Sequence, residues 1–513
     1  MTWPPILQIV PPGLAEDISS HLSETLTVLL FYLAVLGLIS YLAHSRYTGE
    51  LSDYVTASRN LGWVVSTLTI LATIWSGVAL AGFPGTVHGL GASFISSVMI
   101  GLAVSAPLIL YFGRRIWILG QEHDFHTPGD LLGGYYESDT VRLYTVIASL
   151  IFNLAYTVAQ LLAGGIVLNV LSGGILPVEL GMLIIAVVVL IHITTTGIRG
   201  IAWLDTFNGT LILLVLAAFV VFIVRDAGGV MGVFTGLGDL QAAHTTIPGP
   251  RGIFTPLQTI VFGTVFVAGT CVASPAVWVR MYAIRGKQAL FRVAFAYLVI
   301  MTFVHVFGTY FIGTYGRVAF PDIENPDFIS SLLAFEFMPF VLASVFLVAI
   351  LAAIISTTDS YLHILAVTVV RDLIRAVFVP DMEKSRELKL NYLVIMLAAG
   401  MGVVLAILYP GFITPLAVVA GGVTMQLLPP LFGAVAWPRA STEAAIIGPA
   451  AGILVLVGIR LNLLPDPFSS PMLPGLVASL VVNCLLFVLV SYVTKPQPLE
   501  KIEAFHGVIH RKL

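Results

Sequence analysis

Five consecutive polar residues lie in the middle of one apolar stretch and carry the oxygen atoms that bind small cations. The stretch, residues 347–375, reads LVAILAAIISTTDSYLHILAVTVVRDLIR. The helical period places four of its residues on one face, namely Ala353, Ser356, Thr357 and Ser360. Hydroxyl oxygens are hard ligands, so this face predicts a site for a small cation.

Asp359 lies at the edge of the same face. A carboxylate in hydrocarbon is costly, so it normally faces the protein interior or a water-filled cavity, where it binds a cation or relays a proton. A purely structural alternative has the hydroxyls bonded to carbonyls one turn earlier and Asp359 in one interhelical hydrogen bond. Five successive polar side chains exceed what that role needs, so we favour the functional interpretation.

The composition predicts that membrane helices position this face. The chain has 513 residues, of which 58% are hydrophobic and 10% charged, against about 25% charged in soluble domains. The net charge of −3 gives no reason to expect a nucleic-acid partner. No P-loop, HExxH or GxSxG motif is present, so we do not expect an enzyme. No obligate protein partner is evident, and the expected surroundings are a lipid bilayer.

Thirteen apolar windows are long enough to cross a membrane. They lie at about 24–44, 62–87, 91–113, 141–171, 176–196, 201–225, 254–279, 290–315, 331–374, 390–409, 411–437, 442–462 and 471–494. Residues 1–23 contain no Lys or Arg, which predicts that the first window stays as a span with the N-terminus outside. This topology places 20 of the 24 basic residues on the cytoplasmic side, as the positive-inside rule requires. We therefore expect a multi-pass protein of the cell membrane with a cytoplasmic C-terminus.

Glycine and proline interrupt the second and the seventh window. The segments are SGVALAGFPGTVHGLG, residues 76–91, and IVFGTVFVAGTCVASPAVW, residues 260–278. Broken helices at matching positions of two halves indicate a transporter built from inverted repeats. The alternative is that small residues only allow close helix packing.

Six segments in order along the chain resemble motifs of one transporter family. They are RNLG (59–62), SGVALAGFPGTVHGLG (76–91), DFHTPGDLLGGYYES (124–138), GIRGIAWLDTFNGTL (197–211), ILAAIISTTDSYL (350–362) and GAVAWPRAS (433–441). With them the chain resembles the sodium:solute symporters, which include proline, pantothenate, monocarboxylate and sugar permeases.

The resemblance implies an all-α integral membrane protein with about 13 transmembrane helices and a LeuT-like five-plus-five inverted repeat. One extra helix precedes the repeats and two follow them. The implied units are an external N-terminus (1–23), an extra helix (24–44), a first repeat (62–225), a second repeat (254–437), two further helices (442–494) and a cytoplasmic tail (495–513).

The resemblance also implies a Na+ site between two core helices. Its ligands would be the carbonyls of Ala72, Trp75 and Ala353 and the hydroxyls of Ser356 and Thr357. Some members carry an acidic residue in the first of these helices, and this chain has none between positions 72 and 75. Both Na+ and H+ therefore remain candidate coupling ions.

A further cation site or proton pathway is implied at Asp205, Asp359 and Ser360. Asp205 matches an Asp that some members place at the start of the fifth core helix; its alternative role is a helix N-cap near the cytoplasmic face. Arg59 precedes the first core helix and is either a gate residue at the inner mouth or a positive-inside anchor.

A solute would bind beside the helix breaks near the middle of the membrane. The candidate cavity residues are Ser76, Gly77, Phe83, Asn153, Gln160, Phe262, Phe266 and Gln426. No Lys or Arg within the membrane offers itself as a fixed partner for a solute carboxylate. Family membership suggests import of a small organic solute, such as a monocarboxylate or an amino acid, by alternating access. A transporter-fold sensor is the alternative from another class.

Overall fold

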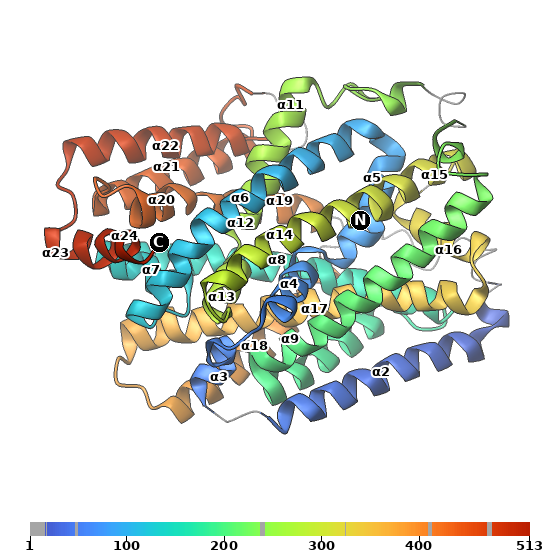
Figure 1. Ribbon diagram of the computed structural model, residues 1–513, viewed down its shortest axis with the longest axis horizontal. Helices are drawn as coiled ribbons and strands as arrows, with labels where there is room; N and C mark the ends of the chain where they lie inside the picture. The colour runs from blue at the N-terminus through green and yellow to red at the C-terminus, as the bar shows by residue number, and fades with distance from the viewer. Residues whose placement is uncertain are drawn as a thin grey trace.

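The computed structural model describes residues 16, 18–46, 50–235, 242–323, 325–408, 413–468 and 474–513. The regular elements named in these ranges are helices, and a single β-bridge joins Leu61 to Ile284. The long helices run roughly side by side along the longest axis of the molecule (Figure 1). The predicted all-α class is thus confirmed. Most of the predicted external N-terminus, 1–23, lies outside the described residues.

The α-helices have the following bounds: α2 Leu22–His44, α3 Leu51–Thr56, α4 Trp63–Ile74, α5 Gly77–Leu90, α6 Ala92–His123, α7 Pro128–Tyr136, α8 Asp139–Leu171, α9 Val178–Asp226, α11 Pro256–Val261, α12 Ala268–Ala273, α13 Pro275–Ala283, α14 Lys287–Phe303, α15 Ile312–Ala319, α16 Ile329–Phe337, α17 Phe340–Val367, α18 Lys384–Leu408, α19 Ile413–Met425, α20 Leu428–Ala436, α21 Thr442–Arg460, α22 Leu476–Val493, α23 Leu499–Ile502 and α24 Val508–Lys512. Four π-helical segments continue some of them, namely η4 Phe262–Val267, η5 Val304–Phe311, η7 Thr368–Phe378 and η9 Glu503–Gly507.

Eleven helices in the described part of the chain are long and apolar enough to cross a membrane. The helix α9 contains two of the thirteen predicted windows, and its backbone leaves the helical conformation at Gly197, where φ is 55°. The second predicted window corresponds to the pair α4 and α5, each shorter than a full span. The number thirteen and the division into repeats at 62–225 and 254–437 therefore stay predictions.

Both predicted interruptions are present. The helix α4 ends at Ile74, because Trp75 (ψ 85°) and Ser76 (ψ 172°) leave the helical conformation, and α5 begins at Gly77. In the seventh window, Ser274 is extended and Pro275 opens α13. Proline suits the first helical position, where a backbone N–H has no intrahelical partner.

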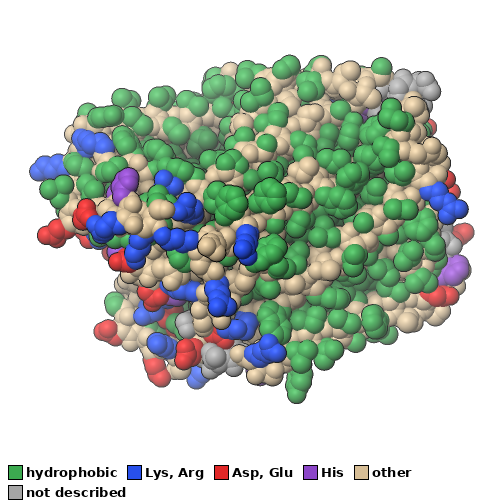
Figure 2. All heavy atoms as spheres, in the orientation of Figure 1, with side chains coloured by type: hydrophobic (Ala, Val, Ile, Leu, Met, Phe, Trp, Pro, Cys, Tyr) green, Lys and Arg blue, Asp and Glu red, His purple; other side chains and the backbone are tan. Residues whose placement is uncertain are grey.

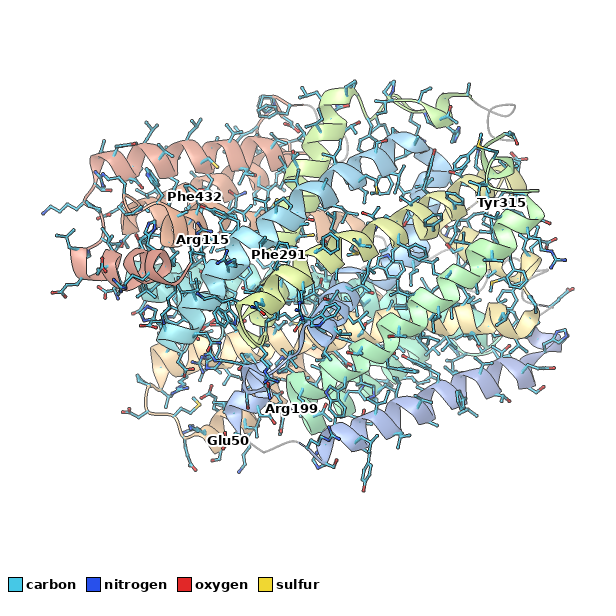
Figure 3. All side chains as sticks on the ribbon, viewed as in Figure 1. Glu50, Arg115, Arg199, Phe291, Tyr315 and Phe432 are labelled. Atoms are coloured by element: carbon cyan, nitrogen blue, oxygen red, sulfur yellow. The ribbon has the colours of Figure 1, made fainter. Side chains whose placement is uncertain are left out.

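The helix α17 lies at the centre of the molecule. Every residue from Phe346 to Val367 is buried, and the helix packs on α8, α9 and α4. Its apolar side chains are covered by other helices, whereas outer helices such as α2 and α22 expose theirs. Exposed Phe291 and Phe432 belong to such outward faces (Figure 3). The polar face of α17 is therefore held inside protein, as its hydroxyls and carboxylate require.

Charged side chains gather mainly at one end of the molecule, and hydrophobic side chains cover the middle (Figure 2). Arg115, Arg199 and Glu50 lie toward the charged end, and Tyr315 lies at the other (Figure 3). Arg199 there pairs with buried Asp53 at 2.5 Å. This distribution agrees with the predicted cytoplasmic loops, although the orientation itself stays a prediction.

The predicted tail, 495–513, is helical and docked at the same end. The Tyr135 hydroxyl on α7 lies 3.1 Å from Nε2 of His506. The ring of Phe505 stacks on His123, at the end of α6, with 4.9 Å between the centroids. The tail thus packs on the end of α6 and on α7, the short helix between α6 and α8.

Candidate cation and solute site

The hydroxyl face of α17 meets the end of α4. The carbonyl oxygen of Ala72 accepts hydrogen bonds from Ser356 Oγ at 3.3 Å and from Thr357 Oγ1 at 3.0 Å. The same hydroxyls contact the Ala353 carbonyl, at 3.3 and 2.8 Å. The structure therefore brings together four of the five oxygen donors predicted for a cation.

The break after α4 explains why carbonyl oxygens are available there. The last carbonyls of a helix have no N–H partner further along the same helix. Trp75, the fifth predicted ligand, directly follows the last residue of α4, so its carbonyl lies outside the hydrogen-bonding pattern of that helix. Buried carbonyl and hydroxyl oxygens can replace the hydration shell of a monovalent cation.

Of the three residues Asp205, Asp359 and Ser360, the structure joins only two through a shared contact, and the predicted common site stays a prediction. Asp205 and Ser360 share a partner, because Nη2 of Arg280 lies 3.3 Å from Asp205 Oδ2 and 2.5 Å from Ser360 Oγ. Asp359 instead faces α9, with Oδ2 at 3.4 Å from Nδ1 of His192. Neighbouring residues point about 100° apart on a helix, so positions 359 and 360 face different helices.

Two related expectations are corrected. Asp205 lies inside α9, well beyond the kink at Gly197, so it is not a helix N-cap. Arg280 is one of the 20 basic residues that the predicted topology places on the cytoplasmic side, whereas α13 carries it into the interior, where its side chain is 1% exposed. It follows the seventh predicted window by one residue. Proline at position 275 was the available signal, because a new helix starting there extends past Arg280.

The predicted solute residues fall into two groups around the breaks. A Cβ atom on Gly77 would lie 3.6 Å from Oε1 of Gln160, so the α8 amide faces the start of α5 beside Ser76. Both polar atoms of Gln160 and Oδ1 of Asn153 are buried without a hydrogen-bond partner among the described residues. Unpaired buried amides are uncommon, and they suit a polar ligand at this position.

The second group is aromatic. The rings of Phe83 and Phe94 lie 5.4 Å apart, and Phe94 lies 6.1 Å from Phe262. Phe262 in turn contacts Phe266 at 5.2 Å. These rings connect α5, α6 and η4, next to the two interrupted segments. Phe94 was missed in the sequence because it lies outside both broken windows.

Gln426 does not belong to either group. Its Nε2 donates to Ser479 Oγ at 3.1 Å, and its Oε1 accepts from Asn483 Nδ2 at 2.9 Å. Both partners are on α22, one of the two helices that follow the predicted repeats. Gln426 therefore holds the outer helix in place and is withdrawn from the solute site.

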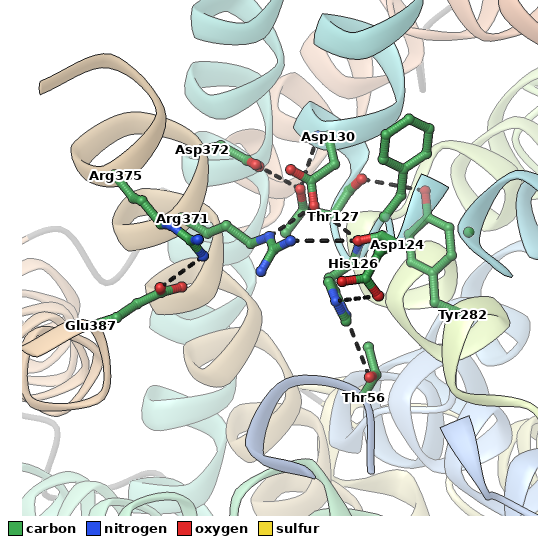
Figure 4. A network of polar contacts seen from close by, with 12 residues as sticks. Thr56, Asp124, His126, Thr127, Asp130, Tyr282, Arg371, Asp372, Arg375 and Glu387 are labelled. Atoms are coloured by element: carbon green, nitrogen blue, oxygen red, sulfur yellow. Dashed lines mark hydrogen bonds and ion pairs between the residues drawn. The ribbon is translucent and has the colours of Figure 1, made fainter. Parts of the chain in front are cut away.

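An ionic network closes the charged end of the core (Figure 4). Nε of Arg371, on η7 beyond α17, donates to Asp130 Oδ2 on α7 at 2.8 Å. Thr127 caps α7 and donates to Asp372 at 2.6 Å. Arg142, from α8, lies within 4 Å of both carboxylates. The network joins the loop before α7 to the end of α17.

The segment before α4 is tied into the same region. Nη2 of Arg59 lies 2.7 Å from Asp124 Oδ1, and Asp124 contacts His126 Nε2 at 3.2 Å. The gate role of Arg59 stays a prediction. Burial and the nearby Arg371 guanidinium lower the pKa of His126 to about 4, so the ring is neutral at neutral pH. Burial raises the pKa of Asp130, but the Arg371 guanidinium and the backbone N–H of His126 together hold that pKa below its usual value.

A model of the Sodium:solute symporter family matches residues 54–452. The chain belongs to that family. This symporter is 27% identical to the sodium/pantothenate symporter of Escherichia coli (strain K12), over 90% of the chain and 95% of the relative. It is 25% identical to the high-affinity proline transporter PutP of Bacillus subtilis (strain 168), over 86% of the chain and 93% of the relative.

Solved structures resemble this symporter over most of their length. The substrate-bound outward-open structure of a Na+-coupled sialic acid symporter matches with a TM-score of 0.79 and 18% identity, covering 92% of this chain and 98% of the other. Mhp1, a nucleobase-cation-symport-1 family transporter, matches with a TM-score of 0.58 and 14% identity, covering 88% and 97%. These neighbours show the LeuT-like fold. Family membership makes the protein a multi-pass, cation-coupled symporter of a small solute, and its relatives are transporters rather than enzymes.

Proposed function

We propose that this symporter imports a small organic solute with Na+, which binds to Ala72, Trp75, Ala353, Ser356 and Thr357. The observation that carries the proposal is the meeting of two α17 hydroxyls with the Ala72 carbonyl at the end of α4. Na+ entering from outside would bind here, join the α4 break to α17 and favour the state that binds solute. The two repeats would then move to open the inner side.

The proposed solute is a small carboxylate that also carries polar groups. The first N–H groups of α5 point toward the break at Ser76, and helix N-termini bind anionic groups without a cationic side chain. The unpaired amide of Gln160 faces the same place from α8. The two relatives named above are symporters or transporters of pantothenate and of proline, which are compounds of this kind. Their names support this solute class.

Proton coupling is the second candidate, and it rests on Asp359. One oxygen of this buried carboxylate has no hydrogen-bond partner among the described residues, and the other faces His192 at 3.4 Å. A carboxylate beside a histidine inside a membrane suits proton relay. Asp205 is less suited to this role, because Arg280 already pairs with it.

Uptake by purified protein in proteoliposomes tests the proposal. Labelled pantothenate, proline, monocarboxylates and sugars are supplied with an inward Na+ gradient, an inward H+ gradient or neither. We expect one carboxylate to accumulate only with the Na+ gradient. Accumulation driven by the H+ gradient alone would contradict Na+ coupling and favour Asp359 and His192.

Gly77 provides a separate test of the helix break. A Cβ atom at this position would lie 2.2 Å from Cγ1 of Ile354 on α17. Overpacking of this kind costs about 1–3 kcal/mol, so we expect Gly77→Ala to lower the initial uptake rate roughly tenfold. Gly62→Ala is the matched control, because a Cβ atom there has no neighbour within 4 Å. Equal rates in the two variants would show that the packing of the break on α17 is not needed for transport.

A further inference from the structure

The place expected for a second cation contains the side chain of Arg280. Its guanidinium donates to Asp205 and Ser360, the two members of the predicted cluster that lie together. It also donates from Nε to Thr69 Oγ1 at 3.0 Å and from Nη1 to the Ala276 carbonyl at 3.3 Å. The arginine thus occupies an oxygen-lined site contributed by α4, α9, α13 and α17.

The oxygen atoms around Arg280 are those that a small cation would bind. Thr69 Oγ1 donates to Asp205 Oδ2 at 2.5 Å, and Thr73 Oγ1 lies 3.2 Å from Ser360 Oγ. Two hydroxyl residues on α4, one on α17 and a carboxylate on α9 therefore meet here. In the absence of a guanidinium, a buried carboxylate with hydroxyl neighbours would need a counter-ion.

The guanidinium lies close to the proposed Na+ site. Ser360 Oγ, which contacts Arg280, donates to the carbonyl of Ser356 at 2.8 Å. The Arg280 contact and the Na+ ligand Ser356 are therefore one helical turn apart on α17. Arginine keeps its charge in proteins, unlike a bound ion that can leave. A second Na+ at Asp205 would compete with this fixed charge for the same oxygen atoms and be repelled by it.

We propose that Arg280 permanently replaces a second coupling cation, so that the symporter binds one Na+ per chain. The inference rests on the proposed function, since it assumes that the Ser356 and Thr357 site binds Na+. Under this inference, Arg280 neutralises Asp205 in every state of the transport cycle. One Na+ would then accompany each solute molecule, so the net charge moved per cycle would be the solute's own charge plus one.

Equilibrium binding of radioactive Na+ to the purified full chain tests this assignment without knowledge of the solute. We expect one ion per chain in wild type. Arg280→Met keeps an apolar stem but leaves Asp205 without its cation, so we expect two ions per chain. The double variant Arg280→Met/Asp205→Asn removes both charges and is expected to bind one. Arg285→Met, an exposed arginine five residues further on, is the matched control and should also bind one.

Each outcome separates the inference from the function on which it depends. Two ions in wild type, or a single ion in correctly folded Arg280→Met, would overturn the replacement of a cation by Arg280. If Arg280→Met does not fold, the number of Na+ ions bound per wild-type chain still tests the inference. Arg280→Lys, which keeps the positive charge, is expected to bind one Na+ per chain. Absence of Na+ binding in wild type would instead refute the proposed Na+ site and the inference with it. Loss of the single ion in Ser356→Ala assigns it to the α17 face.

Discussion

Thr357→Ala is expected to raise the Na+ concentration for half-maximal uptake by tenfold to a hundredfold. The Thr357 hydroxyl lies 3.0 Å from the Ala72 carbonyl and is fully buried, so its removal takes one oxygen ligand from the proposed site. A hydrogen bond or contact to a charged group contributes about 1.5–3 kcal/mol, and each 1.4 kcal/mol is about a factor of ten. Ser356→Ala should have a similar effect, and the double variant should abolish Na+-driven uptake.

The neighbouring residue offers a matched control for this experiment. The Thr358 hydroxyl is equally buried but donates to the Ile354 carbonyl at 2.7 Å, within its own helix. Thr358→Ala should therefore leave the Na+ dependence within about twofold of wild type. Thr357→Ser keeps the hydroxyl and should restore most of the affinity. A Thr357→Ala variant with wild-type Na+ dependence would place the cation elsewhere.

The cation face could be predicted because it depends on one helix and one break. Residues at i, i+3, i+4 and i+7 share a face whatever the tertiary structure, so the positions 353, 356, 357 and 360 followed from spacing. The broken spans were also visible, because glycine and proline weaken helices wherever they occur. The family resemblance then brought the carbonyl of Ala72 to this face, which spacing alone does not do.

The partners of single polar side chains could not be predicted in the same way. Asp359 and Ser360 are adjacent in sequence, yet one faces His192 and the other Arg280. Their separation depends on which helices pack on each side of α17. Gln426 similarly lies inside the predicted core window 411–437 but bonds to α22. A hydropathy window also ends where polarity rises, so it excluded Arg280 although α13 continues past it.

The ionic network at the charged end contains arginines that the sequence marked only as part of the positive-inside bias. Arg371 and Arg375 lie one turn apart, and both have carboxylate partners. Arg371 pairs with Asp130 on α7, and the two side chains are 16% and 13% exposed. Arg375 pairs with Glu387 on α18, and these two side chains are 35% and 1% exposed. The first pair joins α7 to the end of α17, whereas the second only joins α17 to the following helix.

Arg371→Gln is expected to open this network and to slow Na+-driven uptake. Its loss removes the 2.8 Å partner of Asp130 and leaves Arg142, at 3.7 and 3.9 Å, as the cation beside both Asp130 and Asp372, which costs about 2–4 kcal/mol for a largely buried pair. The ratio of molecules with a closed inner side to molecules with an open inner side would then fall roughly 30- to 700-fold. Fewer molecules would then face outward to bind Na+.

Hydrogen–deuterium exchange over residues 128–136 should accelerate by a similar factor. Arg375→Gln removes a pair that joins η7 to α18 and does not contact α7, so it should leave the exchange over residues 128–136 unchanged. Slow exchange in Arg371→Gln would show that the Arg371–Asp130 pair does not hold the inner side closed.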